Sequence, residues 1–300
     1  MAGLTIILML LGNLPVLGVF VLLFCSIPIT IVTVRQGITA GGLASVLSTI
    51  LLALFMGPLS AISGGLQYIL LGWVMGCMLY RRKSAIKTIY ASVGTAAFAA
   101  LALLLINLAL MGFTPEAILA YLDSYKAEML EMYNTTGMTD MLLQVIDLAI
   151  RFMPAMMIIS HGVMAIVTYF ITTQVLKRLK IRIPRLQNLQ NWILPGAFVW
   201  LLIGVWALWL AGDFIEISWM NTLIANLLII FAALLLLDGV ALAMHLFKIP
   251  QMSTGMKAII VFSMFFFFTG YMVALVLAGL ADLLFDFRKL RVDNKKVQKG

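Results

Sequence analysis

The residues that could bind or transfer something in this chain are ionisable side chains inside or beside long apolar runs. Asp238 lies ten residues before Lys248, so a helix rising about 1.5 Å per residue would hold it roughly 15 Å deep. His245 follows seven residues later on a similar helical face. Because a charge in an apolar region is costly, Asp238 and His245 predict a substrate or proton site. The alternative is an acid that bonds to a neighbouring helix and holds the bundle together.

Arg35 completes the candidate ligand-binding set of Asp238, His245 and Arg35. It ends an apolar run, where its long side chain could hold an anionic group or simply extend to the interface. The spacing of these residues leaves both interpretations open.

Other polar residues favour structural roles. Asp147 and Arg151 are spaced i, i+4 and should pair near the outer surface, as an interfacial salt bridge. His161 has no second ligand at metal spacing, so a satisfied hydrogen-bonding residue is expected rather than a metal site. Asn107 and Gln67 are expected to form hydrogen bonds between helices.

The motifs of several enzyme classes do not occur in the sequence. It contains no Gly-x-x-x-x-Gly-Lys-Ser/Thr, no His-Glu-x-x-His and no Gly-x-Ser-x-Gly. The two cysteines, Cys25 and Cys77, lie in apolar runs and are interpreted as small buried hydrophobes. We therefore expect no enzymatic activity, no cofactor and no metal.

The composition indicates whether the chain folds in water or in a lipid membrane. Hydrophobic residues make up 63% of the 300, charged residues only 11%, and the mean hydropathy is +1.10. A soluble domain of this size could not bury so much apolar surface. The net charge of +8 is expected to lie in cytoplasmic loops, so no nucleic-acid partner is expected.

The apolar runs predict an all-α, polytopic transmembrane helix bundle of eight or nine spans, because their length and continuity exceed those of barrel strands. We expect a single membrane domain over residues 1–287 and a flexible, basic, cytoplasmic tail over 288–300. The predicted runs are 2–11, 16–34, 39–55, 61–80, 88–111, 141–176, 192–211, 219–247 and 258–287.

The charges of the loops predict an orientation in the membrane. The basic loops 81–87 and 177–185 should face the cytoplasm. Segment 113–140 is acidic with apolar residues at helical spacing, which predicts an amphipathic helix outside the bilayer. Pro154 should kink or split the long run 141–176. The last run is ambiguous, because a cytoplasmic tail needs a second crossing, with a turn near Gly270, or an interfacial end.

Three parts of the sequence carry a resemblance to a known family. They are Ile27-Pro28-Ile29 with Val34 to Gly41, Gly57-Pro58-Leu59 with Leu71 to Gly76, and Leu237 to Ala241 with His245 to Phe247 and the segment Gly279 to Arg288. Together they resemble the YybS-type family of uncharacterised bacterial membrane proteins, over nearly the whole chain. The terminal Gly-Leu-Ala-Asp and Phe-Asp-Phe-Arg pieces are the most specific.

The resemblance implies a function class. The YybS-type family is distantly similar to the S components of energy-coupling-factor transporters, an analogy of fold. It implies a small-molecule binding or transport subunit that needs a separate energising partner, such as an ATPase and transmembrane coupling module. The alternative is a non-transporting membrane scaffold that recruits partners through its basic loops and tail.

Overall fold

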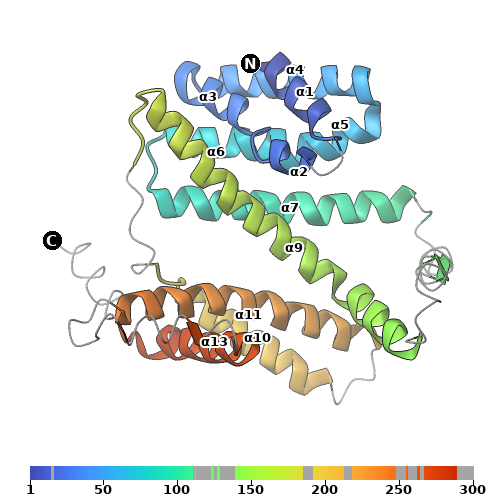
Figure 1. Ribbon diagram of the computed structural model, residues 1–300, viewed down its shortest axis with the longest axis vertical. Helices are drawn as coiled ribbons and strands as arrows, with labels where there is room; N and C mark the ends of the chain where they lie inside the picture. The colour runs from blue at the N-terminus through green and yellow to red at the C-terminus, as the bar shows by residue number, and fades with distance from the viewer. Residues whose placement is uncertain are drawn as a thin grey trace. The chain divides into compact units, whose positions relative to one another are not determined.

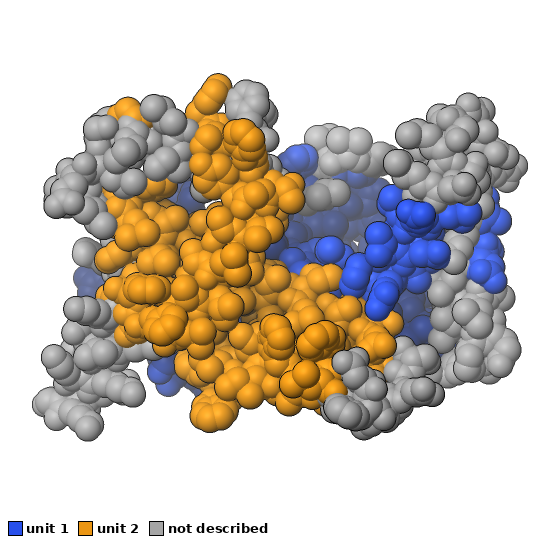
Figure 2. Space-filling view, turned by 90° about the horizontal axis from the view of Figure 1, so that it is seen from below, with its two compact units in different colours: residues 1–186 blue, residues 187–300 orange. Residues whose placement is uncertain are grey.

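The computed structural model describes two compact helical units, residues 1–186 and residues 187–300, called unit 1 and unit 2 below (Figure 2). Every regular element among the described residues is helical. The single domain over 1–287 expected from the sequence stays a prediction, and the first of the two units ends at Leu186. Residues outside the description are 15–16, 111, 113–122, 125–126, 129–138, 185–191, 213–217, 248–254, 256–261, 264–266 and 289–300.

Unit 1 contains most of the described helices (Figure 1). In it α3 packs on α4 and α6, and α7 packs along α9. A single π-helical turn, η1, joins α5 directly to α6. The elements are α1 (Ala2–Leu11), α2 (Leu17–Leu22), α3 (Ile27–Gln36), α4 (Ile38–Met56), α5 (Pro58–Gly64), η1 (Gly65–Ile69), α6 (Leu70–Tyr80), α7 (Ala85–Leu110) and α9 (Thr139–Arg178).

Two glycines make the sharp junctions on either side of α4. Gly37 has φ 100° and Gly57 has φ 85°, in a region that L side chains rarely adopt. Pro58 follows Gly57 at the first turn of α5, where its missing N–H costs nothing. The chain can therefore reverse within one residue, and α5 with η1 returns alongside α4.

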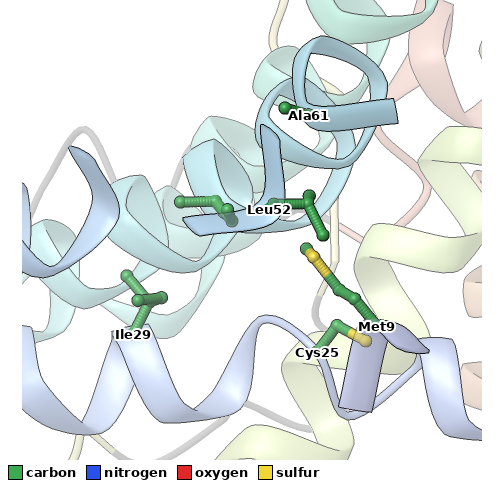
Figure 3. Close-up of a cluster of buried hydrophobic side chains, with 6 residues drawn as sticks. Met9, Cys25, Ile29, Leu52 and Ala61 are labelled. Atoms are coloured by element: carbon green, nitrogen blue, oxygen red, sulfur yellow. The ribbon is translucent and has the colours of Figure 1, made fainter. Parts of the chain in front are cut away.

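The core of unit 1 is a cluster of buried apolar side chains contributed by α1, α3, α4, α5, η1 and the turn before α3. Figure 3 labels Met9, Cys25, Ile29, Leu52 and Ala61, which meet there with Ile69.

Close contact between α3 and α6 explains the Gly72-x-x-x-Gly76 spacing. A Cβ at Gly72 would collide with the carbonyl oxygen of Ser26, and one at Gly76 would lie 2.5 Å from Cβ of Thr33. Thr30 donates a 2.9 Å hydrogen bond to the carbonyl of Gly72 across the same contact. The small residues thus allow two backbones to approach closely, as the spacing predicts.

Helix α9 continues through Pro154 as one element of 40 residues. The split considered from the sequence therefore does not occur. Pro154 has no N–H for the carbonyl four residues earlier, and α9 as a whole packs against α7 and α3.

Unit 2 contains α10 (Ala197–Gly212), α11 (Ser218–Leu246) and α13 (Phe268–Phe285). Gly270 lies in the first turn of α13, and residues 264–266 before it are outside the described part, so the turn considered near Gly270 stays a prediction. One buried cluster joins α10 to α11 through Val205, Ile224 and Phe231. A second joins the segment before α10, α11 and α13 through Leu194, Leu235 and Leu283.

Five helices among the described residues are long and apolar enough to cross a membrane, and four shorter apolar helices accompany them. The long ones are Ile38–Met56, Pro58–Tyr80, Ala85–Leu110, Leu143–Arg178 and Met220–Leu246. The predicted amphipathic helix 113–140 lies almost wholly outside the described residues, as does tail 289–300.

Candidate functional site

In unit 2, two glycines bring α11 and α13 into backbone contact. A Cβ on Gly239 would collide with the carbonyl oxygen of Leu275, and one on Gly279 would collide with that of Leu235. The backbone nitrogen of Gly239 lies 2.8 Å from the Cβ position of Gly279. Asp238 precedes the first glycine and Asp282 follows the second by three residues, so the crossing carries both acids.

Arg288 joins the two acids. Its Nη2 donates to Oδ1 of Asp238 at 2.7 Å and to Oδ2 of Asp282 at 2.6 Å. Its Nε donates to the same Asp282 oxygen at 3.0 Å, and its Nη1 donates to the carbonyl of Trp192 at 2.6 Å. Asp238, Asp282 and Arg288 are 2%, 1% and 6% exposed. We call these three residues the arginine cluster.

The arginine cluster binds together the same three segments as the apolar cluster of Leu194, Leu235 and Leu283. A guanidinium suits this task because its donors form a rigid fork and it keeps its charge. Burying such charges is costly, and the cost is offset only when each is paired and hydrogen-bonded. The geometry therefore supports the structural interpretation of Asp238 in preference to a substrate site.

The remaining ligand-binding candidates do not join this cluster. His245 is half-buried near the end of α11 and makes no hydrogen bond or ion pair within the described part of the chain. Arg35 is exposed in the last turn of α3, in unit 1.

The residues predicted to be structural behave differently from one another. Asn107 donates to the carbonyl of Leu103 in its own helix at 2.7 Å. Asp147 and Arg151 lie on α9, and the Arg151 guanidinium sits 5.9 Å from the ring centre of Phe152. Their predicted salt bridge stays a prediction.

His161 and Gln67 form the polar pair at the centre of unit 1. Nδ1 of His161 lies 2.7 Å from the carbonyl of Met157, and because a carbonyl only accepts, Nδ1 carries the proton. In the neutral ring Nε2 then accepts, and the Gln67 amide nitrogen donates to it at 3.0 Å. The pair links η1 to α9.

A cavity of about 320 Å³ opens beside this pair. Its volume falls in the range of about 300–1,000 Å³ that small-molecule sites occupy. No hydrogen bond of the Gln67 carbonyl oxygen occurs within the described residues, so that acceptor is available. The lining residues are Leu22, Gln67, Tyr68, Leu71, Ala96, Ser160, His161 and Met164.

Gln67 and Tyr68 line the cavity from the π-helical turn η1. A π-turn interrupts the regular hydrogen-bond ladder, and such turns are frequent at functional sites. Here the carbonyl of Tyr68 accepts a 2.8 Å hydrogen bond from the hydroxyl of Ser26, which supports the turn from α3's side. A smaller cavity of about 190 Å³ continues along Gln67 and Tyr68 toward Asn13 and Ser63.

Sequence reasoning missed several of these residues. The sequence places Arg288 in the predicted tail over 288–300, and its part in the fold of unit 2 is not expected from there. Tyr68 and Ser160 had no signal of their own. Their neighbours Gln67 and His161 were each noted, but nothing in the spacing joins residues 94 positions apart.

The long apolar helices and their buried polar contacts define a helical integral membrane protein, seated in a lipid bilayer and crossing it several times. Residues 3–283 match the family described as "predicted membrane protein (DUF2232)", so the chain belongs to that family. No curated protein matches the sequence. No solved structure matches it either.

Proposed function

We propose that this protein is a small-molecule binding subunit of a membrane transport system, with its ligand site in the cavity beside Gln67 and His161. The observation that carries the proposal is that cavity, which combines an apolar wall with a few convergent polar groups. That combination is typical of ligand sites, where apolar surface supplies affinity and a few polar groups supply orientation.

The lining suggests the class of ligand. None of the residues that line the cavity carries a formal charge when His161 is neutral. The Gln67 carbonyl can accept a hydrogen bond and the Tyr68 hydroxyl can donate one, while the Ser160 hydroxyl, which donates to the carbonyl of Met157, can still accept. A neutral molecule with an apolar body and one polar edge fits this wall, because an ionised ligand would be buried without a counter-charge.

The proposed membrane crossings and the proposed energising partner rest on the sequence and on its resemblance to a known family. Five long and four shorter apolar helices support eight or nine crossings of a bacterial cytoplasmic membrane. The sequence has no nucleotide-binding loop, and the resemblance to S components implies a separate ATPase and coupling module as the energising partner. The role proposed is binding and not catalysis.

The experiment is identification of the molecule that co-purifies with the protein. The protein is released gently from its host membrane and denatured, and the released molecules are identified by mass spectrometry. Gln67→Leu should lose the bound molecule. The matched control is Asn107→Leu, which also replaces an intramembrane amide but one bonded only to its own helix.

The same experiment separates the two sites considered in this chain. Loss in Asp238→Asn with retention in Gln67→Leu would move the ligand site to unit 2. If every variant and the native protein are empty, and membrane vesicles show no partner-dependent uptake, the proposal fails.

The scaffold alternative is supported by the basic tail, in which Arg291, Lys295, Lys296 and Lys299 follow Arg288. Deleting residues 289–299 removes these charges while keeping Arg288 in its cluster. A cellular defect that follows this deletion and ignores Gln67→Leu would favour the scaffold.

A further inference from the structure

A separate and larger cavity lies in unit 1, on the α4 side of the π-helical turn. Its volume is about 640 Å³, and α4 forms one wall while α5, η1 and the start of α6 form the other. The residues lining it are Gly42, Ser45, Val46, Thr49, Ile50, Ala61, Ile62, Gly65, Leu66, Ile69, Leu70 and Trp73. It shares no lining residue with the cavity beside His161.

The polar side chains in this wall are all occupied by the protein's own backbone. The hydroxyl of Ser45 donates to the carbonyl of Gly41 at 2.8 Å, and that of Thr49 donates to the carbonyl of Ser45 at 3.0 Å. The indole N–H of Trp73 donates to the carbonyl of Ile38 at 3.1 Å. A polar ligand would therefore lose its own hydrogen bonds with water and find few replacements.

Two glycines create the space. The Cβ position of Gly42 lies 3.6 Å from Nε1 of Trp73, and that of Gly65 lies 3.4 Å from the Thr49 side chain. Any larger side chain at either position would extend into the cavity. The indole of Trp73, held by its bond to Ile38, closes one end.

Both walls belong to helices that are long and apolar enough to cross a membrane, Ile38–Met56 and Pro58–Tyr80. Helices of this kind cross the hydrocarbon region of a bilayer, so acyl chains are the solvent that we expect around the cavity. We infer that it is a binding site for one acyl chain of a membrane phospholipid, held between α4 and the α5–η1–α6 segment.

This inference does not rest on the proposed function, because it concerns another cavity and another chemistry. The test measures contact between Trp73 and the lipid acyl chain. Trp73 is kept as the single tryptophan, and Trp192, Trp200, Trp206, Trp209 and Trp219 become Phe. The protein is placed in phosphatidylcholine vesicles containing phospholipid with brominated acyl chains, which quench tryptophan fluorescence on contact.

We expect brominated chains to quench Trp73, and Gly65→Leu to reduce that quenching at least twofold. Val46→Phe fills the cavity from the other wall, where the side chain is already 59% exposed, and should give the same result if Gly65→Leu does not fold. The control is a single-tryptophan protein that keeps Trp200, which is 75% exposed. Its quenching should be equal with and without the filling substitution.

Two outcomes would overturn the inference. If Trp73 is not quenched, the cavity is covered by protein, from this chain or a partner. If Trp73 is quenched equally after the cavity is filled, the contact is with ordinary surrounding lipid. Mass spectrometry of the bound molecules distinguishes the two sites. Gly65→Leu should lose the bound phospholipid, whereas Gln67→Leu should lose the small molecule proposed to bind beside His161.

Discussion

Arg288 donates a 2.7 Å hydrogen bond to Asp238, a residue 50 positions earlier in the chain, and both are almost fully buried. The bond crosses from the end of α13 to α11, and the same guanidinium nitrogen also binds Asp282. The end of the described chain is therefore part of the fold of unit 2. The segment Gly279 to Arg288, which carries the most specific part of the resemblance, provides the glycine contact, one acid and the arginine.

We expect Arg288→Met to destabilise the protein strongly. Removing one partner of a buried ion pair costs about 3–5 kcal/mol, because the remaining charges lose their counter-ion. Arg288→Lys should recover only part of that loss, since an ammonium lacks the planar fork that reaches three acceptors. The measurement is the free energy of unfolding in detergent, with exposed Arg35→Met as the near-neutral control.

Truncation gives an independent form of the same test. A chain ending at Arg288 should be about as stable as the full chain, whereas one ending at Phe287 should lose the cluster. Equal stability of the two truncated chains would show that Arg288 contributes nothing.

The glycine contact predicts a second pair of effects. Gly239→Ala and Gly279→Ala should each cost about 1–3 kcal/mol or more, because the added methyl meets backbone atoms that cannot move aside. Gly270→Ala, in the same helix but with open space around it, should be neutral or stabilising by up to about 1 kcal/mol. The measurement is the thermal unfolding curve of each of the three variants. Similar unfolding midpoints for all three would rule out the close contact between α11 and α13.

The polar pair of unit 1 predicts a coupling energy. In a double-mutant cycle of Gln67→Leu and His161→Phe, the interaction should be about 0.6–1.7 kcal/mol, the range found for hydrogen bonds between membrane helices. Each change alone leaves a polar partner unsatisfied, so the double variant should be more stable than the sum of the two losses implies. Strict additivity of the unfolding free energies would mean that the bond does not form.

The predicted orientation can be tested by labelling. Cys25 and Cys77 are replaced by Ala, and Lys83→Cys then provides one thiol in the exposed loop between α6 and α7. A membrane-impermeant maleimide should label it only from the cytoplasmic side, because basic loops stay inside. Glu128→Cys, in the acidic segment, should show the opposite sidedness, and labelling of both from one side would contradict the assignment.

The fold class could be predicted because lipid permits few architectures. Once apolar runs of about 20 residues are recognised, unsatisfied backbone groups exclude everything but helices or a barrel. Helix geometry alone predicts the depth of Asp238 in the membrane, which stays a prediction, and its side chain is buried in α11.

The contacts between distant residues could not be predicted. The position of Arg288 after the last apolar run suggested a solvated tail, and only the close contact of Gly239 with Gly279 places Asp238 within its reach. The π-turn at Gly65–Ile69 also had no sequence signal, because nothing local in the sequence shows its packing against α4 and α7. Gln67 lies in this turn and meets His161 of α9.

The central claim is a small-molecule site beside Gln67 and His161, and native mass spectrometry of the intact protein tests it most directly. We predict one bound molecule, other than phospholipid, per chain in the native protein and in Asn107→Leu, and none in folded Gln67→Leu. Native protein that carries no such molecule, or Gln67→Leu that retains it at the same stoichiometry, would contradict the claim.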